Sequence, residues 1–213
     1  MMFRPVPTGE IAPGVYAIRT RYVNFYLIRR DDHVICFDTG TSVRHATRGL
    51  KQLGIKVGDV KSVFLTHSDT DHVGGLSLFT SADLFFPEDE IPLTDGRTKR
   101  APIIRNPGID RPFTTLKDGE RITIGSVPVE TISTPGHTLG SMSYLVDGRI
   151  LIVGDVVELR KGSGIIGPGF LQMDREILKN SLGKLARLHE VELICTGHTG
   201  ISREFDRVME GWR

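Results

Sequence analysis

The most constraining feature of this sequence is the run His-Ser-Asp-Thr-Asp-His at residues 67–72. An apolar, β-like stretch at residues 63–65 precedes it, and the pair Gly74-Gly75 follows it. A strand that ends in such a run delivers its side chains to one point at the edge of a sheet. Four potential metal ligands within six positions is denser than ordinary surface chemistry requires. The run therefore predicts a metal site at a sheet edge.

Three further segments follow β-like runs, and each places one potential ligand beside a glycine: residues 135–138, 154–155 and 197–198. Neutral imidazole and carboxylate groups suit zinc, iron and manganese. Two such ions held a few ångströms apart can share a hydroxide and polarise a scissile bond. Taken singly, each residue could instead be a helix cap, a turn former or a core histidine, but together they favour a two-metal centre. The candidate ligands are His67, Asp69, Asp71, His72, His137, Asp155 and His198.

The same motifs occur in a fixed order along nearly the whole chain. Phe-Asp-Thr-Gly at residues 37–40 comes first, the segment 66–75 and residues 134–141 follow, and Thr-Gly-His at 196–198 comes last. In this order the chain resembles the metallo-β-lactamase-fold hydrolases, a superfamily that also includes glyoxalase II, lactonases and flavodiiron proteins. The resemblance implies an α/β (α+β) fold, the four-layer αββα sandwich. It is much less specific about the substrate.

Carried over residue by residue, the resemblance implies two metal positions with Asp155 as the bridge between them. It also implies that Asp71 serves as the catalytic base that orients the attacking group. Asp38 would orient the surrounding loops without binding metal; as an alternative, it could cap the turn into the next helix. The first position would be held by His67, Asp69 and His137, and the second by Asp71, His72 and His198.

Asp69 departs from the usual family pattern, which has a histidine at this place. If Asp69 binds metal, the centre contains three carboxylates, and the extra charge lowers the Lewis acidity of the ions and favours iron or manganese over zinc. Flavodiiron proteins resemble this variant, since they carry a glutamate there. If Asp69 falls short, the first position is weak or empty. The predicted cofactor is two divalent metal ions, zinc first, with iron or manganese as the alternatives.

Composition indicates a globular enzyme. The 213 residues predict a single domain, 1–213, and 39% of them are apolar, which is ample for a core. Lys and Arg total 27 against 26 for Asp and Glu, so bulk charge points to no nucleic acid or acidic partner. No apolar stretch is long enough to span a membrane, and the prolines near the N-terminus argue against a signal peptide. We expect a cytoplasmic protein with a small-molecule substrate; a homodimer stays open.

The predicted activity is hydrolysis of an ester, thioester, lactone or related acyl bond by a metal-bridging hydroxide. The alternative is a non-haem di-iron protein that binds or reduces O2 or NO, which Asp69 favours. Glyoxalase II is similar at residues 134–141. The sequence continues for only 15 residues after His198, so we expect no extra helical domain of the glyoxalase II type.

Periodicity predicts helices at residues 42–53, 73–79, 174–189 and 201–209, with Asp174 as the cap of the third. Two segments, 96–115 and 159–173, match neither the helix pattern nor the strand pattern. We expect the second segment to border the pocket and to influence substrate choice. Strands are predicted at 15–18, 25–28, 33–37, 60–65, 122–124, 127–132, 141–146, 150–153 and 191–195.

Overall fold

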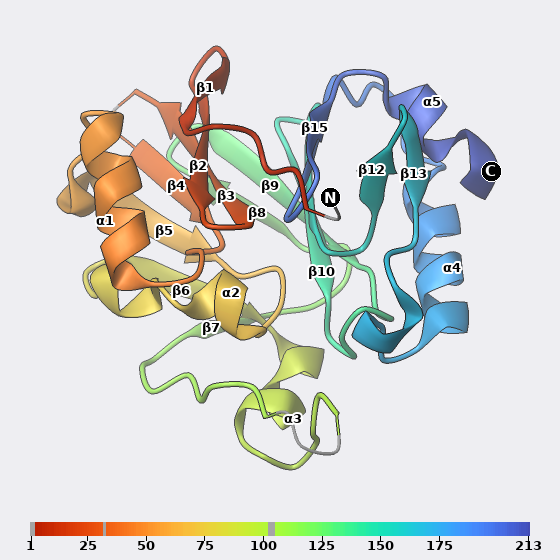
Figure 1. Cartoon of the computed structure of the whole chain (residues 1–213). Coiled ribbons are helices and arrows are strands. Elements are labelled where there is room, and N and C mark those ends of the chain that lie inside the picture. Colours follow the sequence, from red (N-terminus) through yellow and green to blue (C-terminus); the bar gives the residue numbers. More distant parts are fainter. Residues whose placement is uncertain (1–2, 32, 102–104) are drawn as a thin grey trace.

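Two β-sheets face each other at the centre of the structure, a computed structural model that describes residues 3–31, 33–101 and 105–213 (Figure 1). The first sheet contains seven strands in sequence order, antiparallel as far as β4 and parallel from β4 to β7. These strands are β1 (Gly9–Ala12), β2 (Val15–Thr20), β3 (Val23–Arg30), β4 (His33–Phe37), β5 (Val60–Phe64), β6 (Asp83–Pro87) and β7 (Thr114–Leu116).

The second sheet contains six strands in the order β15-β14-β11-β10-β9-β8. A separate hairpin of β12 (Glu158–Arg160) and β13 (Ser163–Ile165) lies within the segment expected to border the pocket. The strands of the second sheet are β8 (Arg121–Ile124), β9 (Val127–Ser133), β10 (Met142–Val146), β11 (Ile150–Gly154), β14 (Leu193–Thr196) and β15 (Gly200–Ser202).

Helices cover the outer face of each sheet, as Figure 1 shows, and so complete the predicted four αββα layers. On the first sheet, α1 (Val43–Gln52) buries Ala46 and Leu50, and Gly49 lets it approach β2 so closely that a Cβ there would lie 2.2 Å from Ile18. On the second sheet, α4 (Arg175–Leu185) and α5 (Phe205–Met209) pack over an apolar core of their own. The inner faces of the two sheets share a third core. The fold prediction is confirmed.

Several predicted elements differ from those observed. The helix expected at 73–79 is wrong: α2 (Thr70–Val73) comes earlier and is followed by a 3-10 turn at Leu76–Leu78. The chain bends at Gly74 and Gly75, where a Cβ would lie 2.4 Å and 2.3 Å from backbone carbonyl oxygens of residues 41 and 39. Asp174 does cap α4, because its carboxylate accepts from the N–H of Ile177 at 2.9 Å. The strand at the C-terminus is β15, which replaces the start of the helix expected at 201–209.

Two tyrosines join the sheets beside the strand ends that precede the metal motifs. The hydroxyl of Tyr26 on β3 donates to the carbonyl of Thr196 at the end of β14 at 2.8 Å. The hydroxyl of Tyr144 on β10 donates to the carbonyl of Leu65, just beyond β5, at 2.5 Å. Each sheet thus anchors a strand end of the other, and both strand ends lead directly into predicted ligands. Among the residues described, no helix has the length and apolar character needed to cross a membrane.

Candidate metal centre

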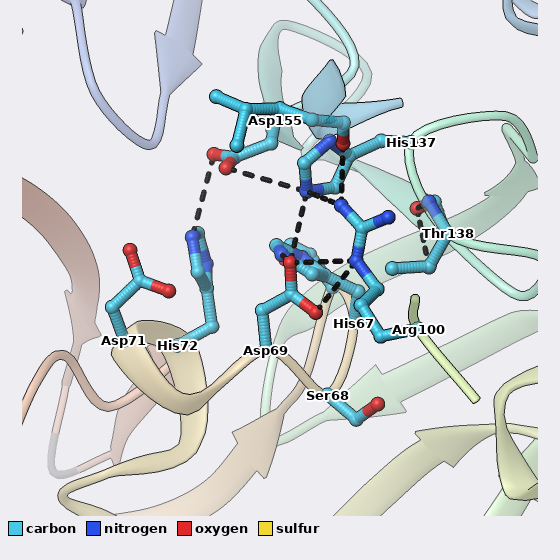
Figure 2. A network of polar contacts seen from close by, with 12 residues as sticks. His67, Ser68, Asp69, Asp71, His72, Arg100, His137, Thr138 and Asp155 are labelled. Carbon is cyan, nitrogen blue, oxygen red and sulfur yellow. Dashed lines mark hydrogen bonds and ion pairs between the residues drawn. The ribbon is translucent and has the colours of Figure 1, made fainter. Parts of the chain in front are cut away.

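The structure brings all seven predicted ligands together at one edge of the two sheets. Figure 2 labels six of them, all except His198. The loop after β5 and the short helix α2 supply the four ligands of residues 67–72. The turn after β9 supplies His137, and Asp155 and His198 directly follow β11 and β14. Potential ligand atoms lie within 4.8 Å of one another in three overlapping groups: His67, Asp69 and His137; Asp71, His72 and His198; and His67, His72 and Asp155.

The first group has the spacing of a metal site. Asp69 Oδ2 lies 3.2 Å from His137 Nε2 and 3.7 Å from His67 Nε2. Ligand atoms about 2.1 Å from a tetrahedral zinc ion would lie roughly 3.4 Å apart. The shorter reach of aspartate, which left open whether residue 69 could take part, is therefore no obstacle in this fold.

The second group meets the first through Asp155. One carboxylate oxygen of Asp155 lies 3.3 Å from His72 Nε2, and the other lies 2.9 Å from His198 Nε2 and 3.5 Å from His137 Nε2. Asp71 Oδ2 lies 3.4 Å from His198 Nε2. Asp155 thus faces histidines of both groups, which is the placement that a bridging ligand requires.

Each of the four histidines is held by its Nδ1 atom, so that Nε2 faces the centre. Such contacts fix the tautomer and the ring orientation of a metal-binding histidine. The Nδ1 partners are Thr66 Oγ1 for His67 at 2.9 Å, Asp38 Oδ2 for His72 at 2.8 Å, Gln172 Oε1 for His137 at 3.0 Å and the Tyr22 carbonyl for His198 at 2.9 Å.

Asp38 organises two of these contacts. Its carboxylate accepts from the backbone N–H of Thr66 at 2.7 Å, from the Thr66 hydroxyl at 2.8 Å and from His72 Nδ1 at 2.8 Å. Its backbone has φ +64°, a conformation that non-glycine residues adopt mainly where the surrounding contacts enforce it. The alternative role as a helix cap is wrong, because Ser42 caps α1.

Three buried polar atoms in this region have the chemistry of metal ligands. Within the described part of the chain, His67 Nε2, His72 Nε2 and Asp155 Oδ1 are buried without a hydrogen-bond partner. Buried polar groups are otherwise almost always hydrogen-bonded, because an unpaired group loses its hydration free energy and gains no hydrogen bond to offset it. These atoms are soft-to-intermediate nitrogen and hard oxygen donors, the set that zinc, iron and manganese accept.

At three of the candidate ligands the pKa shifts favour the protonation state that a metal ligand needs. Burial alone would raise the pKa of Asp155, but His198 and His72 outweigh it and lower that pKa well below its usual value. Burial would also raise the pKa of Asp69, but His137, His67 and Arg100 outweigh it and lower that pKa. Burial, aided by His72, lowers the pKa of His67 well below the ordinary range. Asp155 and Asp69 are therefore charged and His67 is neutral, as ligands must be. Against the effect of burial, Asp155 raises the pKa of His72 and His198, so a metal ion would displace a proton from these two rings.

Sequence reasoning missed three residues that shape the centre. Glu90 is fully buried and accepts four hydrogen bonds from the loops that carry the ligands. Asn106 donates to Asp69 Oδ1 at 3.0 Å and to the Ser68 hydroxyl at 2.6 Å. Arg100 lies against Asp69 and His137. All three come from segments without helix or strand periodicity. The arginine-rich composition of segment 96–115 was a signal for Arg100 and Asn106, and Glu90 had no such signal.

The sequence matches the family model described as the metallo-beta-lactamase superfamily over residues 18–198. The chain belongs to the metallo-beta-lactamase superfamily. Among curated relatives, the Bacillus subtilis protein named "Probable metallo-hydrolase YqgX" is 30% identical over 208 residues, which cover 93% of this chain and 90% of that protein. A hydroxyacylglutathione hydrolase of Vibrio cholerae is 29% identical over 140 residues, which cover 66% of this chain but only 48% of that enzyme.

Solved structures of the superfamily share the fold. BJP-1, a subclass B3 metallo-beta-lactamase of Bradyrhizobium japonicum, matches with a TM-score of 0.71 and 23% identity over 92% of this chain and 79% of its own. A metallo-beta-lactamase of Cronobacter sakazakii with a HARLDQ motif matches with a TM-score of 0.72 and 21% identity over 92% and 80%. At such identities the likeness concerns the fold alone. Family membership and the metallo-hydrolase match support a metal-binding hydrolase as the general function.

Proposed function

We propose that this superfamily member is a dinuclear metal-dependent hydrolase that cleaves an ester, thioester, lactone or related acyl bond, with zinc as the ion at both positions. The single observation that carries the proposal is the convergence of four histidine Nε2 atoms and three carboxylates, with three buried polar atoms left unpaired among the residues described.

When bound, the divalent ions would supply a water of lowered pKa and polarise the substrate carbonyl. The chain's own residues would orient and deprotonate the attacking water, and we assign this task to Asp71. Its carboxylate is 20% exposed, so it can reach both solvent and the centre, and it lies 3.4 Å from His198 Nε2. The rings of Phe3 and Tyr22 flank His198, with centroid distances of 4.5 Å and 5.8 Å.

Substrate choice is proposed to depend on the cavities around residues 158–172. A small cavity at the metal centre is lined by Leu171 and Gln172, and a cavity of about 660 Å³ shares Glu158 with it. The side chains around the larger cavity include four basic residues and two isoleucines. We infer a small-molecule acyl substrate with an anionic group. The basic residues are Arg4, Arg160, Lys161 and Arg175.

The second candidate, a non-haem di-iron protein that binds or reduces O2 or NO, rests on the carboxylate at position 69. Reduction of O2 or NO needs electrons, and the two cysteines of the chain are fewer than an iron–sulfur cluster needs to deliver them. The relatives of Bacillus subtilis and Vibrio cholerae are named as hydrolases. We therefore place this function second.

Elemental analysis of protein purified without added metal, together with an anaerobic absorption spectrum, would test the choice. We expect zinc, no visible absorption band, and hydrolysis of at least one acyl substrate in a panel of esters, thioesters and lactones offered in neutral and anionic forms. Asp155→Asn should remove turnover, whereas Asp83→Asn, a change at an exposed carboxylate on β6, should leave it intact. Iron with a band that responds to oxygen would instead support the di-iron function.

A further inference from the structure

Arg100 reaches the first metal position from a loop that is far away in the sequence. Its Nε atom lies 3.0 Å and 3.1 Å from the two carboxylate oxygens of Asp69, and its Nη2 atom lies 3.3 Å from His137 Nε2 (Figure 2). The side chain is only 8% exposed. Nη2 also donates to the carbonyl of Leu171. A fixed positive charge is thus directed at two of the three ligands in the first group.

The contact with His137 uses the lone pair that a metal ion would need. In the neutral ring, His137 Nδ1 donates to Gln172 Oε1 at 3.0 Å, and the lone pair of Nε2 accepts the Arg100 N–H at 3.3 Å, with Asp69 Oδ2 at 3.2 Å on the same side. An imidazole nitrogen has one lone pair, so it cannot bind Arg100 and a metal ion at the same time. Asp69 Oδ2 likewise accepts from Arg100 Nε while it faces His137 Nε2, so a metal ion at the first position would compete with Arg100 for this oxygen too.

The second metal position lacks such a contact. Its ligands are Asp71, His72 and His198, together with Asp155. Across residues 3–31, 33–101 and 105–213, no lysine or arginine forms a hydrogen bond or ion pair with any of these four side chains. The two halves of the centre therefore differ in charge. Among these residues, a permanently charged side chain lies against the ligands only at the first position. A guanidinium and a divalent ion this close repel each other strongly in a partly dry site.

We propose that Arg100 is an internal competitor for the first metal position. The protein then binds one ion tightly at the second position and accepts another only when Arg100 withdraws. This inference rests on the metal centre of the proposed function and adds an order of loading to it.

Withdrawal of Arg100 would also change the wall of the cavity. Its Nη2 atom donates to the carbonyl of Leu171, while the neighbouring Gln172 holds His137. Leu171 and Gln172 both line the small cavity beside Asp155 and His198. Filling the first position would release segment 168–173 from the loop that carries Arg100. Metal loading and access to the centre are thus coupled through one side chain.

Zinc titration of the metal-free protein, by calorimetry with a competing chelator, tests this order. For the wild type we expect two binding steps whose affinities differ by about tenfold or more, within the range of coupled sites. Arg100→Met keeps an unbranched side chain as far as the position of Nε but removes the charged guanidinium. It should tighten the weaker step by about tenfold while leaving the stronger step within about twofold. Arg97→Met is the matched control. Arg97 lies in the same loop, is 66% exposed and pairs with Asp95, so its loss should change neither step.

Hydrogen exchange provides an independent readout. In the wild type, the second zinc equivalent should speed exchange in segment 168–173, whereas Arg100→Met should show fast exchange there from the start. Loss or weakening of the weaker step in Arg100→Met would overturn the proposal, because it would mean that Arg100 holds Asp69 in place for the metal. Two equal steps in the wild type would also overturn it.

These measurements need no turnover, so failure to find a substrate does not bear on them. Absence of any zinc binding would overturn the metal centre and this inference together. Zinc binding that Arg100→Met leaves unchanged would overturn the role of Arg100 alone.

Discussion

Glu90 lies beneath the centre and joins the two ligand-bearing loops, and replacing it should cost much more stability than an ordinary surface change. One carboxylate oxygen accepts from the backbone N–H and hydroxyl of Ser68, at 2.8 Å and 2.6 Å. The other accepts from the hydroxyl of Thr138 at 2.7 Å and the backbone N–H of Gly140 at 3.0 Å. All four donors are buried. Glu90→Gln preserves the shape of the side chain but turns one acceptor into an NH2 donor.

Either orientation of the new amide sets that NH2 against a backbone N–H, from Ser68 or from Gly140. The hydroxyls can rotate and accept, but a backbone N–H cannot, and a buried donor left unpaired costs about 1–3 kcal/mol. The bonds to the remaining oxygen also lose their charge, which costs about 1 kcal/mol more. Burial raises the pKa of Glu90, so a neutral amide avoids part of the desolvation cost. We expect a net loss of about 2–4 kcal/mol from a total of about 5–15 kcal/mol.

Urea unfolding of the metal-free protein at pH 7 measures this loss directly. The midpoint should fall with an unchanged m-value, and Tm should drop by about 5–12 °C for a chain of this length. Glu88→Gln is the control, because Glu88 is exposed and pairs only with Lys117 at the surface, and it should change stability by about 0.5 kcal/mol at most. If Glu90→Gln unfolds with the wild-type midpoint, the four hydrogen bonds do not stabilise the loops and the reasoning fails.

Four more changes test other parts of the structure. Because the pKa of Glu90 is raised, the folded state keeps a proton that the unfolded state has lost above pH 4.5, so the stability gap between the wild type and Glu90→Gln should narrow in urea melts as pH rises from 4.5 to 7. Asp38→Asn should weaken the stronger zinc step by about 10–100-fold in chelator competition, since Asp38 orients His72; an unchanged affinity would contradict that role. Asp69→Ala should remove roughly one metal per chain and most activity; unchanged metal content in elemental analysis would exclude Asp69 as a ligand. Burial raises the pKa of the Cys36 and Cys195 thiols, so neither should react with Ellman's reagent at pH 8 before denaturation, and one fast thiol in the native protein would be inconsistent with this packing.

The four layers were predicted from the family resemblance, whereas most strands and the convergence of the candidate ligands were predicted from local patterns. Alternating apolar residues mark β9 and β10, and the ligands come directly after β-like runs, whose ends meet at a shared sheet edge. That the seven side chains would converge was therefore foreseeable. Their role as ligands remains a prediction that metal analysis must test.

The remaining features depend on contacts between distant segments. Glu90 belongs to the acidic run Glu88-Asp89-Glu90, which reads as a solvated surface until the turn at residues 138–140 packs onto it. Arg100 and Asn106 lie in a segment with no periodicity, and nothing local directs them towards Asp69. The helix at 73–79 was wrong because apolar spacing favours it, whereas Gly74 and Gly75 are needed where the chain runs against residues 39–41. In each case tertiary packing overrides local preference.

The candidate ligands are divided between the two sheets: residues 67–72 follow β5 of the first, and His137, Asp155 and His198 follow strands of the second. A bound ion would thus act as a removable cross-link between halves that are otherwise joined there by tyrosine hydroxyls and apolar packing. Ligand at 100 times its Kd adds about 2.7 kcal/mol to stability. Without metal, the two sheets would separate more readily at this edge, and proteases would cleave the metal-free protein faster than the metal-bound protein. Metal supply would then set the lifetime of the protein as well as its activity.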